Sequence, residues 1–224
     1  YWVWAPQTIY DRKAKKYMIY FTLQRNDRKS LITYYAYANK DFTGFESEPK
    51  QLFSAKYGSI DNDIIEKDGT YHLFYKGNTK DENGKEIKNG IQQATSKSLK
   101  GKWKEDFKYL DAYAGKTPVE GSSIFKLNGK DEYVLMYDMY TSGRYEYQTS
   151  TDLYHFSEPK AFTKDFFPRH GSVISLTRDE LQRLQEKWGY VVKYEFESQG
   201  NPIVRHIHTA DPAALVKGDT LWLF

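Results

Sequence analysis

The sequence contains no cysteine, no long hydrophobic run and no large excess of one charge sign. The lack of cysteine among 224 residues excludes disulfide bonds, thiolate metal sites and a cysteine nucleophile. No stretch approaches the roughly 18 consecutive apolar residues of a membrane span, and no basic-then-apolar leader opens the chain. Lys and Arg total 33, and Asp and Glu total 30, which gives a net charge of +3. This balance disfavours a protein whose affinity for nucleic acid comes from counterion release.

Aromatic residues, in contrast, are abundant. The 20 Tyr, 13 Phe and 5 Trp residues make up 17% of the chain, although the mean hydropathy is only -0.78. Rings that carry a polar group suit strands that are apolar on one side, and aromatic planes also pack on the faces of sugars. Packing between β-sheets accounts for most of these residues.

Short runs of β-branched and aromatic residues, bounded by turn residues, dominate the chain, and helical periodicity is nearly absent. The clearest runs are residues 15–22, 70–77, 132–138 and 219–224. Turn signals such as Asp68-Gly69, Asn128-Gly129 and Gly218-Asp219 supply the positive φ that a tight hairpin needs. The pattern predicts hairpins in series.

A weak internal repeat accompanies the hairpins. Similar segments start at Ala38, Thr95 and Thr149, and aligning them on Asp41, Ser98 and Asp152 gives intervals of 57 and 54 residues. A period of this length holds about four short strands, which is the content of one propeller blade. The competing β-sandwich would not repeat one motif at a fixed interval. The sequence therefore predicts an all-β propeller.

One helix is predicted near residues 178–188. Thr177 and Glu180 form the capping box at its start, and Gly189 ends it. An apolar face predicts that the helix packs against the propeller edge. That face carries Leu181, Leu184 and Trp188.

Three acidic residues stand at the starts of strand-like runs: Asp61, Glu120 and Asp211. The innermost strand of each propeller blade lines the axis, so acids at these positions are expected to converge at one mouth of the channel. Glycoside hydrolysis needs such a group of carboxyls, with one protonated to serve as acid and one ionised. A third carboxylate raises the pKa of the acid by like-charge repulsion and helps to orient it.

The segments around these acids resemble glycoside hydrolase family 43, whose five-bladed propellers remove or cut arabinose and xylose units in plant polysaccharides. The segments VWAPQTIYD, SIDNDII, VEGSSIFKL and PRHGSVISLT resemble the family's second to fifth blades, and HTADPAALV resembles the start of its first blade. The resemblance covers most of the chain, with residues 1–190 as blades two to five and residues 191–224 as the start of blade one. It implies a five-bladed β-propeller, incomplete or permuted.

The resemblance also implies roles for individual residues. Glu120 is the expected general acid, Asp211 the general base for water, and Asp61 the modulator of Glu120. His170 is expected near the axis, facing a substrate and either a calcium ion or an ordered water, and no cofactor is required. Inversion of configuration would place the Glu120 and Asp211 carboxyl groups roughly 6.5 to 9.5 Å apart, whereas about 5 Å would indicate a covalent mechanism.

Two departures from the family pattern leave the organisation open. Gln7 stands where the family commonly has an acid after Trp-Ala-Pro. Asp211 comes last in the chain, although the base-bearing segment of the family precedes Trp-Ala-Pro. Either the chain is a permuted or incompletely covered propeller with one site, or it spans the junction of two tandem modules.

Each candidate residue also has a structural interpretation. Asp61 and Glu120 suit turn positions, and His170 suits a hydrogen-bonded core position. Arg144, a candidate for binding a sugar hydroxyl or carboxylate, also suits a surface ion pair. Trp4 can stack on a sugar ring or pack in the core.

The predicted function is hydrolysis of arabinofuranosyl or xylosyl linkages in an oligosaccharide or polysaccharide by a protein that is exported. The alternative from another class is a propeller that binds carbohydrate without cleaving it. A fructan-acting propeller is less favoured, because the chain has no Arg-Asp-Pro motif and no cysteine. Binding of nucleic acid ranks last because of the charge balance, and no membrane span is expected. Residues 78–89, rich in charged residues and Gly, are expected to rim the site.

Overall fold

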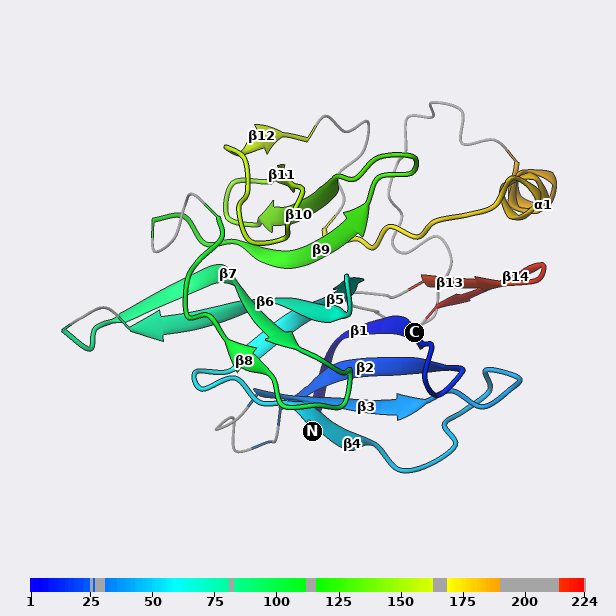
Figure 1. The fold of residues 1–224 in the computed structure, drawn as a ribbon, viewed down its shortest axis with the longest axis horizontal. Helices are drawn as coiled ribbons and strands as arrows, with labels where there is room; N and C mark the ends of the chain where they lie inside the picture. Colours follow the sequence, from blue (N-terminus) through cyan, green and yellow to red (C-terminus); the bar gives the residue numbers. More distant parts are fainter. Residues whose placement is uncertain are drawn as a thin grey trace.

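The computed structural model describes residues 1–24, 26, 31–80, 83–111, 116–162, 169–189 and 214–223. These residues form three four-stranded antiparallel sheets, one two-stranded hairpin and one helix (Figure 1). The fold is therefore mostly β, as the sequence predicts. The sheets of the described residues do not join into a closed ring.

Each four-stranded sheet is a meander in which strand order follows chain order. Sheet 1 contains β1 (Trp2–Asp11), β2 (Lys16–Gln24), β3 (Leu31–Tyr37) and β4 (Lys50–Phe53). Sheet 2 contains β5 (Ser59–Lys67), β6 (Thr70–Lys80), β7 (Glu86–Ser96) and β8 (Lys104–Glu105). Sheet 3 contains β9 (Glu120–Lys126), β10 (Tyr133–Met139), β11 (Arg144–Ser150) and β12 (Lys160–Ala161). The first strands contact one another from sheet to sheet, β1 with β5 and β5 with β9, so they line one side of the stack.

The repeat found in the sequence corresponds to one sheet. Asp41, Ser98 and Asp152 each lie in the connection between the third and fourth strands of their sheet. An apolar residue follows each of them and is buried. These residues are Phe42, Leu99 and Leu153. Three successive units thus share one architecture, which is the arrangement of propeller blades and not of a sandwich.

Sheet 2 is buried on both faces, because sheets 1 and 3 pack against it (Figure 1). Side chains of β6 alternate between the two interfaces. Tyr75 packs on Phe53 of sheet 1 with ring centroids 5.3 Å apart, and Phe74 packs on Phe156 of the third unit at 5.9 Å. Tyr75 and Phe74 are fully buried. Because both faces of β6 are buried, consecutive residues in its central part are apolar or aromatic instead of alternating with polar residues.

The predicted hairpin turns are present. Asp68 and Gly69 both have positive φ, at 49° and 72°, as a two-residue turn between β5 and β6 requires. Gly129 and Gly218 have φ values of 72° and 59° in the turns after β9 and β13. Local sequence therefore determines where these strands reverse.

The helix α1 (Arg178–Trp188) has the predicted ends. Thr177 accepts a hydrogen bond from the Glu180 backbone N–H, the Glu180 side chain accepts from Thr177, and Gly189 closes the last turn. The predicted packing of its apolar face is wrong, because Leu181 and Trp188 are 46% and 65% exposed and no residue of the helix is buried. No helix in the described ranges is long and apolar enough to cross a membrane.

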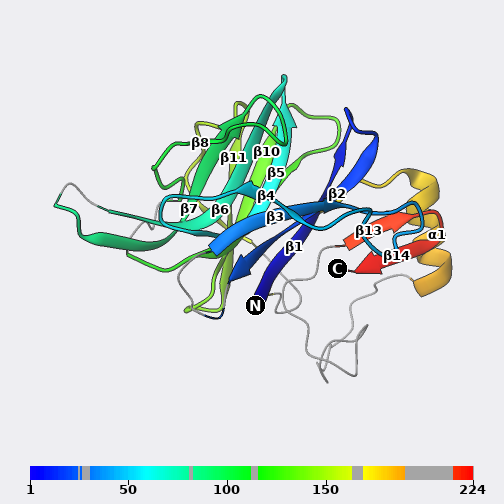
Figure 2. The same ribbon diagram turned by 90° about the horizontal axis from the view of Figure 1, so that it is seen from below.

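Polar contacts instead attach the helix to the hairpin of β13 (Ala214–Lys217) and β14 (Thr220–Leu223). Arg183 Nε lies 2.9 Å from Asp219 Oδ1, and Lys187 Nζ donates to the Asp219 carbonyl at 3.1 Å. On its other side the hairpin contacts sheet 1, where Lys217 Nζ donates to the Lys40 carbonyl at 2.6 Å (Figure 2). The end of the chain therefore lies beside β1.

Candidate functional site

Each first strand is interrupted near its start by a break in register with the second strand. At each break one residue has a left-handed backbone: Ala5 at φ 42°, Asp61 at 57° and Gly121 at 64°. His170, in a fourth segment beyond sheet 3, has φ 65°. Such bulges re-aim side chains and are common beside active sites. Here they act at the same end of three neighbouring strands.

The four segments enclose a small cavity of about 30 Å³. Its lining consists of Ala5, Pro6, Gln7, Asp61, Asn62, Gly121, Ser122, His170, Gly171 and Ser172. Gln7 Nε2 donates to Ser172 Oγ at 2.7 Å and so joins β1 to the fourth segment. The cavity has room for ordered water but not for a sugar ring.

Asp61, Glu120 and His170 form a cluster in which one ligand atom from each lies within 4.8 Å of the others. Asp61 and His170 line the cavity, whereas Glu120 precedes the lining residue Gly121 and is not itself part of the lining. His170 Nε2 lies 3.2 Å from Glu120 Oε1, and its Nδ1 lies 4.0 Å from Asp61 Oδ1. Asp61 is only 4% exposed, and its Oδ2 accepts the Gly121 N–H at 2.9 Å. The structure thus brings together two of the three acids that the sequence singles out, beside the predicted histidine.

Glu120 has cationic neighbours that the sequence analysis did not select. Lys76 Nζ donates to Glu120 Oε2 at 3.1 Å, and Arg169 approaches Oε1 at 3.8 Å. Burial raises the pKa of Glu120, but the hydrogen bond from His170 and the charge of Lys76 outweigh burial and leave that pKa below its ordinary value. The expected rise caused by Asp61 is therefore wrong for this arrangement, because the positive neighbours prevail.

A buried carboxylate supports the fourth segment. Asp138 on β10 is 1% exposed and pairs in register with Glu120. Its Oδ2 accepts from Arg169 Nε at 2.9 Å and lies 4.0 Å from His170 Nε2. Asp138 therefore fixes the segment that carries the histidine.

A second buried acid lies deeper between the sheets. Asp63 Oδ2 accepts the Ile124 N–H at 2.9 Å, and its Oδ1 lies 3.4 Å from the Tyr20 hydroxyl. Burial raises the pKa of Asp63 to about 7, although hydrogen bonds from the Ile124 and Ile64 backbones and from Tyr20 oppose the rise. Asp63 links three sheets and lies away from the cavity lining, so we assign it to structure.

The cluster meets the distance requirement of a metal site but fits a calcium ion poorly. Calcium takes about six to eight oxygen ligands. Asp61 and Glu120 supply carboxylates, His170 supplies nitrogen, and Lys76 and Arg169 bring positive charges to the same Glu120. These three side chains and the two cations form the charged groups of the cluster.

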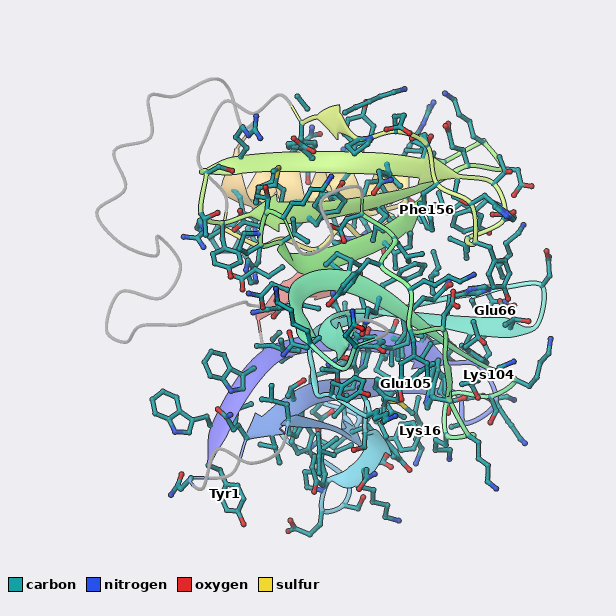
Figure 3. The ribbon with its side chains drawn as sticks, turned by 90° about the vertical axis from the view of Figure 1, so that its left-hand side faces the viewer. Tyr1, Lys16, Glu66, Lys104, Glu105 and Phe156 are labelled. Carbon is teal, nitrogen blue, oxygen red and sulfur yellow. The ribbon has the colours of Figure 1, made fainter. Side chains whose placement is uncertain are left out.

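Two predicted sugar-binding residues, Trp4 and Arg144, do not line the cavity. Trp4 stacks on Trp2 with ring centroids 6.1 Å apart. Tyr1, labelled in Figure 3, precedes Trp2 in the chain and is 79% exposed. Arg144, which is exposed, lies 3.8 Å from the buried Glu146 and so forms an ion pair at the surface. Among the described residues, the lining of the cavity includes neither Trp4 nor Arg144. The predicted base, Asp211, lies outside the described residues.

Comparison with known proteins gives a family match and a fold match. Residues 1–182 match the glycosyl hydrolase 43-related family, described as a probable glycosyl hydrolase domain. No curated protein matches the chain.

Two solved structures share the fold. One is an exo-beta-1,3-galactanase from Phanerochaete chrysosporium with galactose, with 19% identity and a TM-score of 0.51 over 70% of this chain and 35% of that one. The other is the GH43_1 enzyme from Xanthomonas citri complexed with xylotriose, with 10% identity and a TM-score of 0.52 over 71% of this chain and 55% of that one. The chain spans about half the length of the solved structures it matches, or less.

Proposed function

The chain belongs to the glycosyl hydrolase 43-related family, and from that premise we propose that it hydrolyses arabinofuranosyl or xylosyl linkages in plant polysaccharides with inversion. The observation that carries the proposal is the cluster at the start of the first strands, where Asp61 and Glu120 approach within 4.8 Å beside the cavity. Most enzymes that hydrolyse glycosidic bonds use a pair of carboxyl groups at one site.

In this proposal Glu120 is the general acid. Its side chain is 18% exposed, so one edge of the carboxyl group can reach a glycosidic oxygen beside the cavity. Glu120 transfers its proton to that oxygen as the bond to the anomeric carbon breaks, and the departing sugar leaves as an alcohol. His170 and Lys76 then stabilise the carboxylate that remains.

Asp61 orients the acid. It accepts the N–H of Gly121, the residue after Glu120, and so fixes the backbone on which Glu120 is mounted. Because Asp61 is 4% exposed, it is shielded from solvent by the bulge and serves as a partner of Glu120 and His170.

Asp211 is the proposed general base, which removes a proton from the water that attacks the anomeric carbon. One feature supports this role: Asp211 precedes β13 by three residues, and β13 contacts β1. We propose that the hairpin of β13 and β14 begins a further blade of a five-bladed propeller whose other described blades are sheets 1 to 3.

The reaction as proposed needs only carboxyl groups and water, so no cofactor takes part. Polysaccharides of plant cell walls lie outside cells, and the proposal therefore includes export of the protein. The nature of the sugar rests on the family alone. Because one protein of similar fold is named as a galactanase, β-galactosides belong in the substrate screen beside arabinofuranosides and xylosides.

The test separates an enzyme from a protein that only binds carbohydrate. Glu120→Gln keeps the shape of the side chain but cannot donate a carboxylic acid proton. We expect hydrolysis of the best glycan to fall by about 10²- to 10⁴-fold, with its dissociation constant little changed. Glu158→Gln, an exposed site on the third unit, is the matched control. Unchanged turnover in Glu120→Gln, or binding without turnover in the wild type, would overturn the proposal.

A further inference from the structure

One position of the repeat, on the second strand of each sheet, faces the residue that precedes the bulge. Strand register pairs Thr22 with Trp4, Lys76 with Ile60, and Asp138 with Glu120. Thr22, Lys76 and Asp138 are therefore equivalent residues of the three units, although their chemistry differs.

All three residues reach forward to the next unit of the chain. Thr22 Oγ1 accepts from Asn62 Nδ2 at 2.8 Å. Lys76 Nζ donates to Glu120 at 3.1 Å. Asp138 accepts from Arg169 in the fourth segment at 2.9 Å. The residue at this position thus connects each sheet to the bulge region of the next unit in the chain. In sheet 2 this contact is made to Glu120, the proposed acid.

The Lys76 ammonium group is held from several sides. Its side chain and that of Glu120 are each 18% exposed, so the pair is largely shielded from water. The ammonium lies 5.7 Å from the centroid of the ring of Tyr140, the residue that directly follows β10. Tyr140 Oη in turn accepts from Asn89 Nδ2 at 3.1 Å. A shielded charge-assisted bond of this kind is stronger and more directional than an exposed ion pair.

We infer that Lys76 is a positioning residue that fixes the carboxyl group of Glu120 for proton donation. Lys76 holds Oε2 and His170 holds Oε1, so the carboxyl plane has one preferred orientation. Neither Thr22 nor Asp138, at the equivalent positions, carries a donor long enough for this contact. The inference rests on the proposed function, because positioning of the Glu120 carboxyl by Lys76 assists catalysis only if Glu120 is the general acid.

The first test uses the dependence of rate on the leaving group. Departure of dinitrophenolate needs no proton, whereas departure of a sugar or methanol does. We expect Lys76→Met to lower kcat about 10- to 100-fold for the sugar leaving group and less than about 3-fold for dinitrophenyl glycosides. KM should change little, and Lys76→Arg should recover much of the loss because it keeps the charge.

The matched control is Lys126→Met. Lys126 lies on β9, the strand of Glu120, and pairs with the exposed Asp131 at 3.0 Å. It should keep wild-type rates with both leaving groups. Equal losses for both leaving groups in Lys76→Met, or rates as in the wild type, would overturn the inference.

The second test needs no activity and so separates failure of the inference from failure of the proposed function. In a crystal structure of Lys76→Met, the Glu120 carboxyl group should rotate away from the position that it has in the wild type, while its place in Lys126→Met is unchanged. A Glu120 carboxyl that keeps its orientation without Lys76 overturns the inference, whatever the protein hydrolyses. A wild-type protein inactive on every glycoside, with a rotated carboxyl in the variant, would overturn the proposed function alone.

Discussion

At the scale of single residues, the unusual feature is a proposed acid surrounded by positive groups. Glu120 receives hydrogen bonds from His170 and Lys76, and Arg169 lies within 3.8 Å. Burial alone would favour the protonated form of Glu120, yet these neighbours favour the ionised form. The free protein therefore holds most of its Glu120 as carboxylate at neutral pH.

This environment predicts an acidic activity profile. General acid catalysis needs protonated Glu120, and its protonated fraction falls as the pH rises through a pKa that lies below the ordinary value. The pH dependence of kcat/KM reports ionisations of the free enzyme. For a substrate with a sugar leaving group, kcat/KM should therefore be highest at acidic pH and should fall as the pH rises toward neutral. Steady-state rates across the acid range check this. A decline that begins only above neutral pH would contradict the assignment.

At the scale of structural elements, the bulges create the site. Asp61 tolerates the left-handed backbone better than most residues, and Gly121 accepts it without strain. An added Cβ at Gly121 would lie 2.9 Å from the His170 ring, so the lack of a side chain there is also a packing requirement. The bulge of β9 and the position of the histidine are therefore coupled.

Gly121→Ala tests this coupling, and Gly129→Ala is its matched control. Gly121 and Gly129 have φ values of 64° and 72°, so alanine costs about 1 kcal/mol of backbone strain at either site. Only at Gly121 does the methyl group meet His170. We expect similar losses of Tm in both variants and a loss of activity of about tenfold or more only in Gly121→Ala. Equal activities would show that the His170 ring can shift without consequence.

The sequence predicts most of the elements and part of the site. Turn residues such as Asp68-Gly69 and the capping box at Thr177 act locally, so their structures follow from the local sequence. Ala5 at positive φ is not predictable in this way, because the fold imposes that conformation on a residue that disfavours it. The exposed face of α1 likewise depends on tertiary contacts that periodicity does not reveal.

The residues that support the site are hard to identify from the sequence, because strand pairing brings together residues that are far apart in the chain. Lys76 is more than 40 residues away in the chain from its partner Glu120. Asp138 is about 30 residues away from its partner Arg169. A signal for them does exist in the sequence. Aligning the second strands of the repeat, YFT, FYK and MYD, places Thr22, Lys76 and Asp138 at one position. Motif matching alone does not mark that position as functional.

At the scale of the whole molecule, the buried Asp63 connects the sheets. It belongs to sheet 2, accepts the N–H of Ile124 in sheet 3 and lies beside the hydroxyl of Tyr20 in sheet 1. The Tyr20 hydroxyl also accepts the Ile64 N–H at 3.0 Å. One side chain thus joins three units at the interface that supports the cluster.

The pKa of Asp63 predicts how stability depends on pH. Its value is about 7 in the folded protein, above that of an unfolded aspartate, so the folded state retains a proton that the unfolded state releases between the two values. The contribution of Asp63 to the free energy of unfolding is therefore largest at low pH and falls as the pH rises to about 7. Urea titrations at several pH values measure this fall.

Asp63→Asn removes the ionisable group, so the part of the pH dependence of the free energy of unfolding that Asp63 causes should disappear. At neutral pH the variant should match or exceed the wild-type free energy of unfolding by on the order of 1 to 3 kcal/mol, because it no longer buries a charge. The exposed Asp41→Asn is the control and should retain the wild-type pH dependence. Parallel curves for the wild type and Asp63→Asn would show that another group carries the effect.

The anomer of the first sugar released is the most direct measure of the proposed reaction. Proton NMR of an arabinofuranoside, xyloside or galactoside incubated with the protein resolves the two anomers before they equilibrate. The account predicts that the sugar appears first as the anomer opposite to that of the substrate, and that Glu120→Gln releases none in the same time. First appearance of the retained anomer would contradict the inverting mechanism, and no release from any of the three glycosides would contradict the hydrolase itself.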